Sequence, residues 1–391
     1  MIWSRSLRSG SGITSSEASS QSLSKFYFFT VPENTASLNT PKGLVNRLEA
    51  ALEAQALPAP RTQPLPNAAA ARLRRRRTLS LVVLSALVVV FSALYLFAFV
   101  NPKYFEFAMS LRLPRYAGIA TAAAAIAGAS MIFQTLIRNT IVTPCLLGMN
   151  SLYVLVHTGV VFFLGSGSDF STDPILSFLL DIVVMGTVAA VVYNAIFEKT
   201  GGNVLYVLLI GTVLSTFFGS VQSSLTRVMD PNEYDALLNS LVASFSNVNA
   251  SVLIPGWILL GLIVLWLRRD LKLLDVIALG RENAINLGVD YERTVRRLMT
   301  GVALSIAVAT ALVGPLSFLG LITANLARQL LQTHRHVPLI AGSVLIGVLI
   351  LTAGQFFVEH VALYSVPVSV FVTVGGGLYF LYLILRAPKR G

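Results

Sequence analysis

The chain has 391 residues, of which 55% are hydrophobic and 12% charged, with a formal net charge of +11. Soluble domains carry about 25% charged residues, so this composition excludes an ordinary soluble protein. The single cysteine, Cys145, excludes an intramolecular disulfide bond. Basic loops of a membrane protein explain the positive charge, and we therefore expect no nucleic-acid partner.

Residues 1–77 differ in composition from the rest of the chain. They are rich in Ser, Pro, Gln and Asn, and their short apolar patches show no sustained period. We predict a mostly disordered cytoplasmic N-terminal tail that ends in the basic run RLRRRR at 72–77. A short amphipathic helix fits within residues 41–57, where leucines recur at helical spacing.

Residues 78–391 form the predicted transmembrane domain. A membrane-spanning helix needs about 20 apolar residues, and the run 79–100 reaches that length without a charge. The hydropathy pattern predicts an all-α, polytopic membrane protein with about ten transmembrane helices. The predicted spans are 79–100, 116–136, 144–164, 174–197, 203–225, 253–268, 298–318, 319–333, 338–358 and 367–386.

The charges of the loops predict the orientation. Lys and Arg gather before the first span and in the loop 269–297, whereas the alternate loops carry mainly Asp and Glu. The positive-inside rule then places both termini in the cytoplasm, which fits an even number of spans. We expect the chain to lie in contact with membrane lipid.

Small residues and chain breaks follow the first span. The segment 117–130 is almost all Ala, Gly, Ser and Thr, which permits close packing of helices in lipid. Pro144 suits a first helical turn. Gly201-Gly202 and Gly314-Pro315 interrupt later spans, and backbone breaks at membrane depth persist only where protein or a wet cavity surrounds them. Each break is interpreted either as a structural turn or as part of the lining of a transport pathway, and the sequence supports both interpretations.

Ionisable residues inside the spans are scarce. Asp181, in the outer third of the fourth span, is the clearest one. Ion-coupled carriers place carboxylates at mid-membrane, so a single off-centre Asp favours helix pairing and an energy source in another subunit. The chain has no GxxxxGK[ST] phosphate loop, and its four histidines form no metal-ligand pattern. We expect no enzyme activity, no cofactor and no metal site.

The loop 270–297 is charged but patterned. Apolar residues cluster on either side of Gly280, which predicts two short helices on the cytoplasmic surface. The apolar face of such a helix fits either lipid or a groove on a soluble partner.

Six ordered blocks of sequence carry a resemblance to a known family. They are LRLPR at 111–115, the small-residue helix leading to Gln134 and Asn139, the pattern Pro144-x-x-Leu147-Gly148-x-x-Ser151, ALGRENAINLGV at 278–289, GPLSFLGL at 314–321 and the closing segment 366–386. Over residues 79–386 the chain resembles the FecCD family of ABC importer permeases, which carry iron–siderophore complexes, haem or cobalamin.

The resemblance implies the ABC type II importer permease architecture in a bacterial cytoplasmic membrane. It also implies a second permease subunit (a copy or a relative), a cytosolic ABC ATPase dimer and an extracytoplasmic siderophore-binding protein. It implies that Arg112 and Arg115 dock the binding protein. It also implies that a coupling helix in the loop 270–297 meets the ATPase through Leu279, Gly280, Arg281, Glu282, Asn283, Ala284, Leu287 and Gly288.

Departures from the family pattern point to a branch. The usual Pro-His of the eighth helix reads Ala324-Asn325, and the segment after Asn139 is similar to the catecholate branch of petrobactin and anguibactin permeases. In relatives the cytoplasmic gate lies at the start of the fifth helix, here Asn203. The candidate pathway and gate residues are Gln134, Asn139, Pro144, Gly148, Asn203, Gly314 and Pro315.

The sequence thus predicts the permease subunit of an ABC importer that moves ferric siderophores into the cytoplasm by using ATP hydrolysis in a partner. A cobalamin or haem permease, an ion-coupled secondary transporter and a membrane scaffold without transport are the alternatives.

Overall fold

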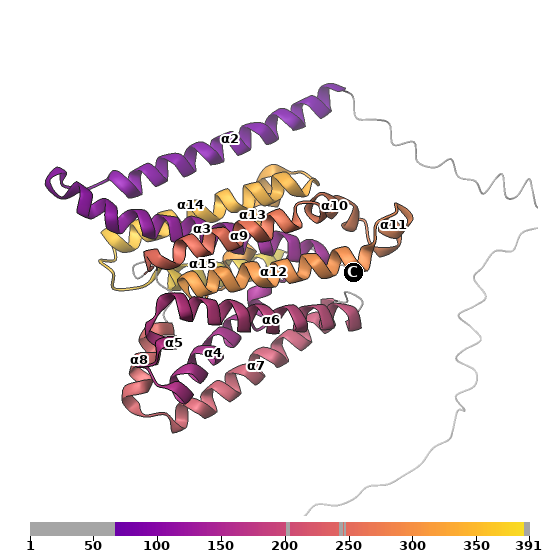
Figure 1. Cartoon of the computed structure of the whole chain (residues 1–391). Coiled ribbons are helices and arrows are strands. Elements are labelled where there is room, and N and C mark those ends of the chain that lie inside the picture. Colours follow the sequence, from indigo (N-terminus) through magenta and orange to yellow (C-terminus); the bar gives the residue numbers. More distant parts are fainter. Residues whose placement is uncertain (1–66, 201–203, 242–244, 246–247, 387–391) are drawn as a thin grey trace, which may run out of the picture. The chain divides into compact units, whose positions relative to one another are not determined.

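All regular structure in the computed structural model is helical over the residues that it describes, which are 67–200, 204–241, 245 and 248–386. Each predicted span corresponds to one helix of a bundle (Figure 1). These helices are α2 (Asn67–Phe97), α3 (Phe105–Ile137), α4 (Met149–Leu164), α6 (Pro174–Thr200), α7 (Val204–Val228), α9 (Ala250–Leu267), α12 (Tyr291–Val313), α13 (Leu319–Leu331), α14 (His336–His360) and α15 (Val368–Arg386).

Length and hydropathy confirm a polytopic membrane protein. Within the described ranges, six helices are long and apolar enough to cross a membrane, namely α2, α3, α6, α9, α12 and α14, and α4 and α15 are shorter apolar helices. Short elements connect them: η1 (Pro102–Tyr104), η2 (Pro144–Leu147), α5 (Asp169–Thr172), α8 (Pro231–Leu241), α10 (Asp270–Ile277) and α11 (Arg281–Asn286).

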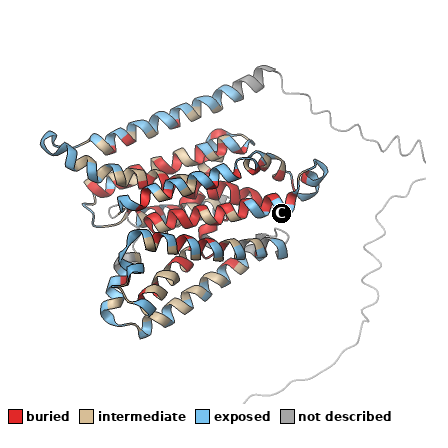
Figure 2. Cartoon of the chain, in the orientation of Figure 1, coloured by how far each residue is buried: buried red, intermediate tan, exposed pale blue. Residues whose placement is uncertain are grey.

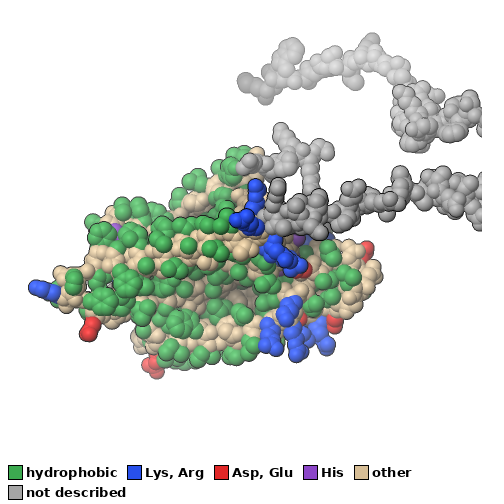
Figure 3. Space-filling view, turned by 90° about the horizontal axis from the view of Figure 1, so that it is seen from above, with side chains coloured by type: hydrophobic (Ala, Val, Ile, Leu, Met, Phe, Trp, Pro, Cys, Tyr) green, Lys and Arg blue, Asp and Glu red, His purple; other side chains and the backbone are tan. Residues whose placement is uncertain are grey.

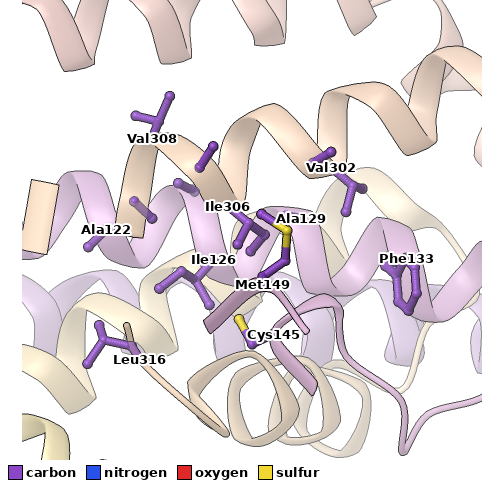
Figure 4. Close-up of a cluster of buried hydrophobic side chains, with 14 of the residues drawn as sticks. Ala122, Ile126, Ala129, Phe133, Cys145, Met149, Val302, Ile306, Val308 and Leu316 are labelled. Carbon is purple, nitrogen blue, oxygen red and sulfur yellow. The ribbon is translucent and has the colours of Figure 1, made fainter. Parts of the chain in front are cut away.

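Helices α3 and α12 form the centre of the bundle. In their most apolar windows 78% and 72% of the residues are buried, and they show red in Figure 2. The small residues of α3 permit this packing, since a methyl group added to Gly347 of α14 would lie 3.3 Å from the Cβ of Ala123. Figure 4 shows the core where side chains of α3 and α12 meet Cys145 of η2, Met149 of α4 and Leu316.

Helix α2 lies at the edge of the bundle and packs mainly against α14 (Figure 1). Only 11% of its apolar window is buried, and Val82, Val89 and Val90 are exposed. In a membrane such a surface contacts lipid chains. The helix begins at Asn67, within the range 1–77 assigned to the tail; residues 1–66, including the amphipathic segment 41–57, lie outside the described part.

The two ends of the bundle carry different charges. Helices α10 and α11 lie at one end, and α5 and α8 at the other (Figure 1). Figure 3 shows Lys and Arg side chains gathered toward the end with α10 and α11, and hydrophobic side chains along the flank. We call these the basic end and the opposite end. The predicted segregation of basic and acidic loops is therefore present in three dimensions.

Several helix starts differ from the predicted spans; α12, for example, begins at Tyr291, inside the predicted loop 270–297. LRLPR at 111–115 lies inside α3, which begins at Phe105, because Pro114 is accommodated within the helix. Pro144 starts the 3₁₀ helix η2, and α4 begins five residues later at Met149. Gly148 separates them with φ +97, a backbone conformation that L side chains rarely adopt.

Candidate functional site

The loop 270–297 forms the two predicted short helices at the basic end. Gly280, with φ +105, separates α10 from α11. Leu279 and Leu287 flank α11 and are 56% and 63% exposed, whereas Ala284 is fully buried against the bundle. Arg281, Glu282, Asn283 and Gly288 are exposed as well. Helix α11 therefore presents exposed apolar and charged side chains, while its buried Ala284 packs against the bundle.

Helix α10 is anchored to the bundle by two carboxylates. The Oδ1 of Asp275 accepts a hydrogen bond from the backbone N–H of His336 (2.8 Å) and lies 2.6 Å from its ring Nδ1. A carboxylate at the first turn of α14 is favourable because the helix dipole is positive there. Asp270, with a side chain 5% exposed, lies 3.6 Å from the guanidinium of Arg297 on α12. These contacts join α10 to both α12 and α14.

The buried Gln134 connects α3 to α13. It is 1% exposed, its Oε1 accepts a hydrogen bond from Arg328, and its Nε2 has no partner among the described residues. Asn139 closes the turn after α3, since its Oδ1 accepts from the N–H of Ile141 at 2.8 Å. The Nδ2 of Asn325 donates to the carbonyl of Thr140 at 2.8 Å. Hydrogen bonds thus link the end of α3 and the turn after it to α13.

Two chain breaks separate helices of the bundle, at Pro144–Gly148 before α4 and at Gly314–Phe318 before α13. The predicted break at Gly201-Gly202 lies outside the described residues. Helix α13 has 13 residues, about 20 Å, and α4 has 16, about 24 Å; neither crosses the roughly 30 Å hydrocarbon layer alone. Gly314, with φ +83, ends α12, and Phe318, with φ +61, precedes α13. Gly314 and Leu316 are buried and Phe318 is half-buried, so protein covers much of the backbone at this break.

A hydrogen bond joins the two breaks across 167 residues of sequence. The Nδ2 of Asn150, in the first turn of α4, donates to the Oγ of Ser317 at 2.9 Å. The Oδ1 of Asn150 and the Oγ1 of Thr143 are buried and have no partner among the described residues. Pro144, Gly148 and Gly314 are buried around this point, and Pro315 is half-buried. Asn203, the predicted gate residue, lies outside the described residues.

Helix α7 carries a row of exposed hydroxyl groups. Thr212, Thr216, Ser220 and Ser224 recur every four residues, so they share one face of the helix. Each hydroxyl donates to a carbonyl of its own helix at 2.8–2.9 Å. Small hydroxyl residues on a membrane helix favour contact with another helix or a wet cavity over lipid. This face of α7 is therefore suited to a subunit contact or a pathway.

The two arginines of LRLPR lie toward the opposite end and have partners within the chain. The Nη1 of Arg112 donates to the backbone carbonyls of Tyr95, Leu96 and Ala98 at 2.8–3.2 Å, which satisfies the end of α2. Arg115 lies 3.6 Å from the Oε1 of Glu359 on α14 and its side chain stays 19% exposed. Neither contact was predicted from the sequence.

Asp181 is paired with His157, as the helix-pairing interpretation expects. The Oδ2 of Asp181 on α6 lies 3.1 Å from the Nε2 of His157 on α4, and Asp181 is 2% exposed. The pair joins two helices away from the breaks at Asn150 and Ser317. Within the described ranges, no group of three or more His, Cys, Asp or Glu side chains is placed to hold a metal ion.

Comparison with known proteins decides the family. The sequence model of the FecCD transport family matches residues 77–386. The chain belongs to the FecCD transport family. A FecCD protein is a transport permease and not an enzyme, and the ten helices that match the predicted spans fit the permease subunit of an ABC importer.

Individual relatives cover nearly the whole FecCD domain. The petrobactin import system permease protein YclO of Bacillus subtilis (strain 168) is 38% identical over 80% of this chain and 99% of its own length. The petrobactin import system permease protein FatC of Bacillus anthracis is 32% identical over 66% of this chain and 73% of its own length.

A solved structure has the same fold. It is an inward-facing conformation of a metal-chelate type ABC transporter, with a TM-score of 0.68 and 22% identity. The similarity covers 79% of this chain and 99% of that one. As a FecCD permease, the chain works with an ATPase and a binding protein.

Proposed function

We propose that this FecCD permease imports ferric siderophores of the catecholate and mixed catecholate type, with petrobactin-like chelates as the first candidates. The observation that carries the substrate class is the 38% identity to YclO, over 99% of that petrobactin permease. FatC, the second relative, also has a name that refers to petrobactin.

The transport pathway runs past the two helix breaks. The Asn150–Ser317 hydrogen bond brings them together inside the bundle, and broken helices in transporters line the substrate route. Gln134, Asn139, Pro144, Gly148, Asn203, Gly314 and Pro315 remain the candidate pathway and gate residues. The hydroxyl face of α7 contacts the second permease subunit or the pathway between the two subunits, because small hydroxyl side chains favour such contacts over contact with lipid.

Helix α11 is the docking element for the ATPase. It is exposed at the basic end, and its exposed leucines suit the apolar groove of a soluble partner. The anchoring of α10 by Asp270 and Asp275 supports the transmission of a push on α11 to α12 and α14. Two permease subunits and two ATPase subunits form the proposed complex.

The binding protein docks at the opposite end through Arg112 and Arg115. Outward positive charges there steer and orient an acidic partner surface. Arg115 is the clearer of the two, because Arg112 also satisfies the end of α2. The basic end faces the cytoplasm by the positive-inside rule, with both termini on that side, residues 1–77 as the tail and 78–391 as the permease domain.

Radioactive iron uptake by a strain that lacks this gene tests the proposal. Iron is supplied as a catecholate, a hydroxamate and a haem complex, and uptake is restored with the intact gene. We expect loss and recovery of catecholate iron uptake alone. Unchanged uptake from every source, in a strain without redundant permeases, would reject the assignment and favour a cobalamin substrate.

A further inference from the structure

A small basic hollow lies between the start of α2 and the end of α13. Its volume is about 210 Å³, and its polar lining consists of Arg76, Arg77 and Ser80 of α2 and of Gln332. Leu79, Leu330 and Leu331 complete the lining. It is separate from the breaks at Asn150 and Ser317 and from helix α11, so the proposed transport function assigns no role to it.

The charges in this hollow are uncompensated. No Asp or Glu belongs to its lining, and neither guanidinium forms an ion pair with a carboxylate among the described residues. Arg77 is half-buried, and its Nη1 lies 3.5 Å from the Oγ1 of Thr333, which holds the side chain toward α13. Two adjacent guanidinium groups in a concave site favour an anion, and their planar forks match the oxygens of a phosphate.

The position of the hollow selects the kind of anion. The apolar surface of α2 begins at Leu79, which is 61% exposed, and continues through Val82 and Val83 at 59% and 47%. On the other side Leu330 is 50% exposed. In a membrane these residues contact acyl chains, which places Arg76 and Arg77 at the level of the lipid headgroups. An occupant with an anionic head and two apolar chains matches both halves of the site.

We propose that this hollow is a binding site for an anionic phospholipid, with the phosphodiester on Arg76 and Arg77 and the acyl chains along α2 and α13. The bound lipid fills the gap between the peripheral α2 and α13. Helix α13 also carries Arg328, the partner of Gln134, so the lipid supports the helix that holds the interior connection. The inference rests on the membrane placement of the chain and not on the identity of the transported substrate.

Native mass spectrometry of the full chain, purified and delipidated in detergent, tests the site. Phosphatidylglycerol and phosphatidylcholine with identical acyl chains are added separately, and the retained lipid is counted. The double variant Arg76→Gln/Arg77→Gln is compared with Arg74→Gln/Arg75→Gln, which removes the same charge from exposed residues outside the hollow. We expect the intact chain to prefer phosphatidylglycerol, and the first variant alone to lose that affinity, by about tenfold.

Three results would overturn the proposal. Equal retention of the two lipids would show that the headgroup charge is not recognised. Equal losses in the two double variants would mean diffuse attraction to the whole basic run. Displacement of the lipid by millimolar inorganic phosphate would make the hollow a site for free phosphate. If the glutamine variant does not accumulate in membranes, Arg76→Lys/Arg77→Lys replaces it; selective binding must then fall because an ammonium group lacks the bidentate fork, and unchanged selectivity would reject the site.

Discussion

The Nη1 of Arg115 lies 3.6 Å from the Oε1 of Glu359, whose side chain is 5% exposed. The same carboxylate oxygen accepts hydrogen bonds from the hydroxyl of Tyr95 (2.9 Å) and the amide of Gln355 (3.0 Å). Arg115 also donates to the hydroxyl of Tyr364 at 3.3 Å. A residue expected to meet an acidic partner protein is therefore held by an acid of its own chain.

The contact between Arg115 and Glu359 predicts opposite effects on binding of the partner protein when one or the other residue is substituted. Arg115→Glu should weaken binding of the partner binding protein by about tenfold or more at low salt, since attraction becomes repulsion. Glu359→Gln should strengthen it, because the amide can still bond to Tyr95 while Arg115 is released. Binding to the permease in nanodiscs is measured by biolayer interferometry.

Lys103→Glu is the control for Arg115, because it makes the same charge change at an exposed residue near the start of α3. Its effect should be small. Equal weakening by Lys103→Glu and Arg115→Glu would show that net charge, and not the position of Arg115, governs docking.

The Asn150–Ser317 contact should be needed for transport. Asn150→Ala and Ser317→Ala each remove a hydrogen bond between the breaks, and a double-mutant cycle should give a coupling of about 0.5–1.5 kcal/mol in thermal stability. Each variant should insert normally and lower uptake. Ser305→Ala is the control, because this buried serine on α12 bonds within its own helix, to Gly301. Additive effects of the two alanines would contradict the role of the contact.

The coupling helix predicts a separation of ATP hydrolysis from transport. Gly280→Leu strains a residue with φ +105 and places side-chain atoms toward Arg138, and Glu282→Lys reverses an exposed charge on α11. The combined variant should insert but copurify poorly with the ATPase and lose uptake. Glu106→Lys, an exposed acid at the start of α3, should leave copurification unchanged. Normal uptake in the combined variant would remove α11 as the coupling helix.

Close packing of α13 on α3 predicts a strong effect of one methyl group. A Cβ on Gly320 would lie 1.8 Å from the Oγ and 2.6 Å from the Cβ of Ser130. Gly320→Ala should cost roughly 1–3 kcal/mol, and Ser130→Gly in the same chain should recover much of it. Gly261→Ala, where a Cβ meets nothing within 4 Å, should be neutral. The melting temperature of each variant is measured in detergent. If Ser130→Gly does not restore the melting temperature of Gly320→Ala, a clash with Ser130 is not the cause of the destabilisation.

The sequence predicted the elements of this fold better than their contacts. Each of the ten predicted spans corresponds to a helix, and Gly280 correctly separated α10 from α11, because hydropathy and a glycine break are local signals. The prediction placed the start of α4 too early, since Pro144 fits a 3₁₀ turn as well as an α-helix.

Contacts between distant residues carried no local signal. Asp275 caps the start of α14 at His336, and Arg112, predicted only to dock the binding protein, caps the end of α2. The side-chain partner of Asp181 lies 24 residues away, at no helical spacing. Such pairs depend on how helices pack, so only the three-dimensional arrangement shows them.

Reconstitution tests the central claim most directly. The permease, its ATPase, the second permease subunit and the binding protein are placed in liposomes, and uptake of radioactive iron is measured as a catecholate complex, a hydroxamate complex and haem. The account predicts uptake that requires ATP and the binding protein, and that is fastest for the catecholate. Uptake driven by a proton or sodium gradient without ATP, or ATP-driven uptake of haem but not of the catecholate, would contradict it.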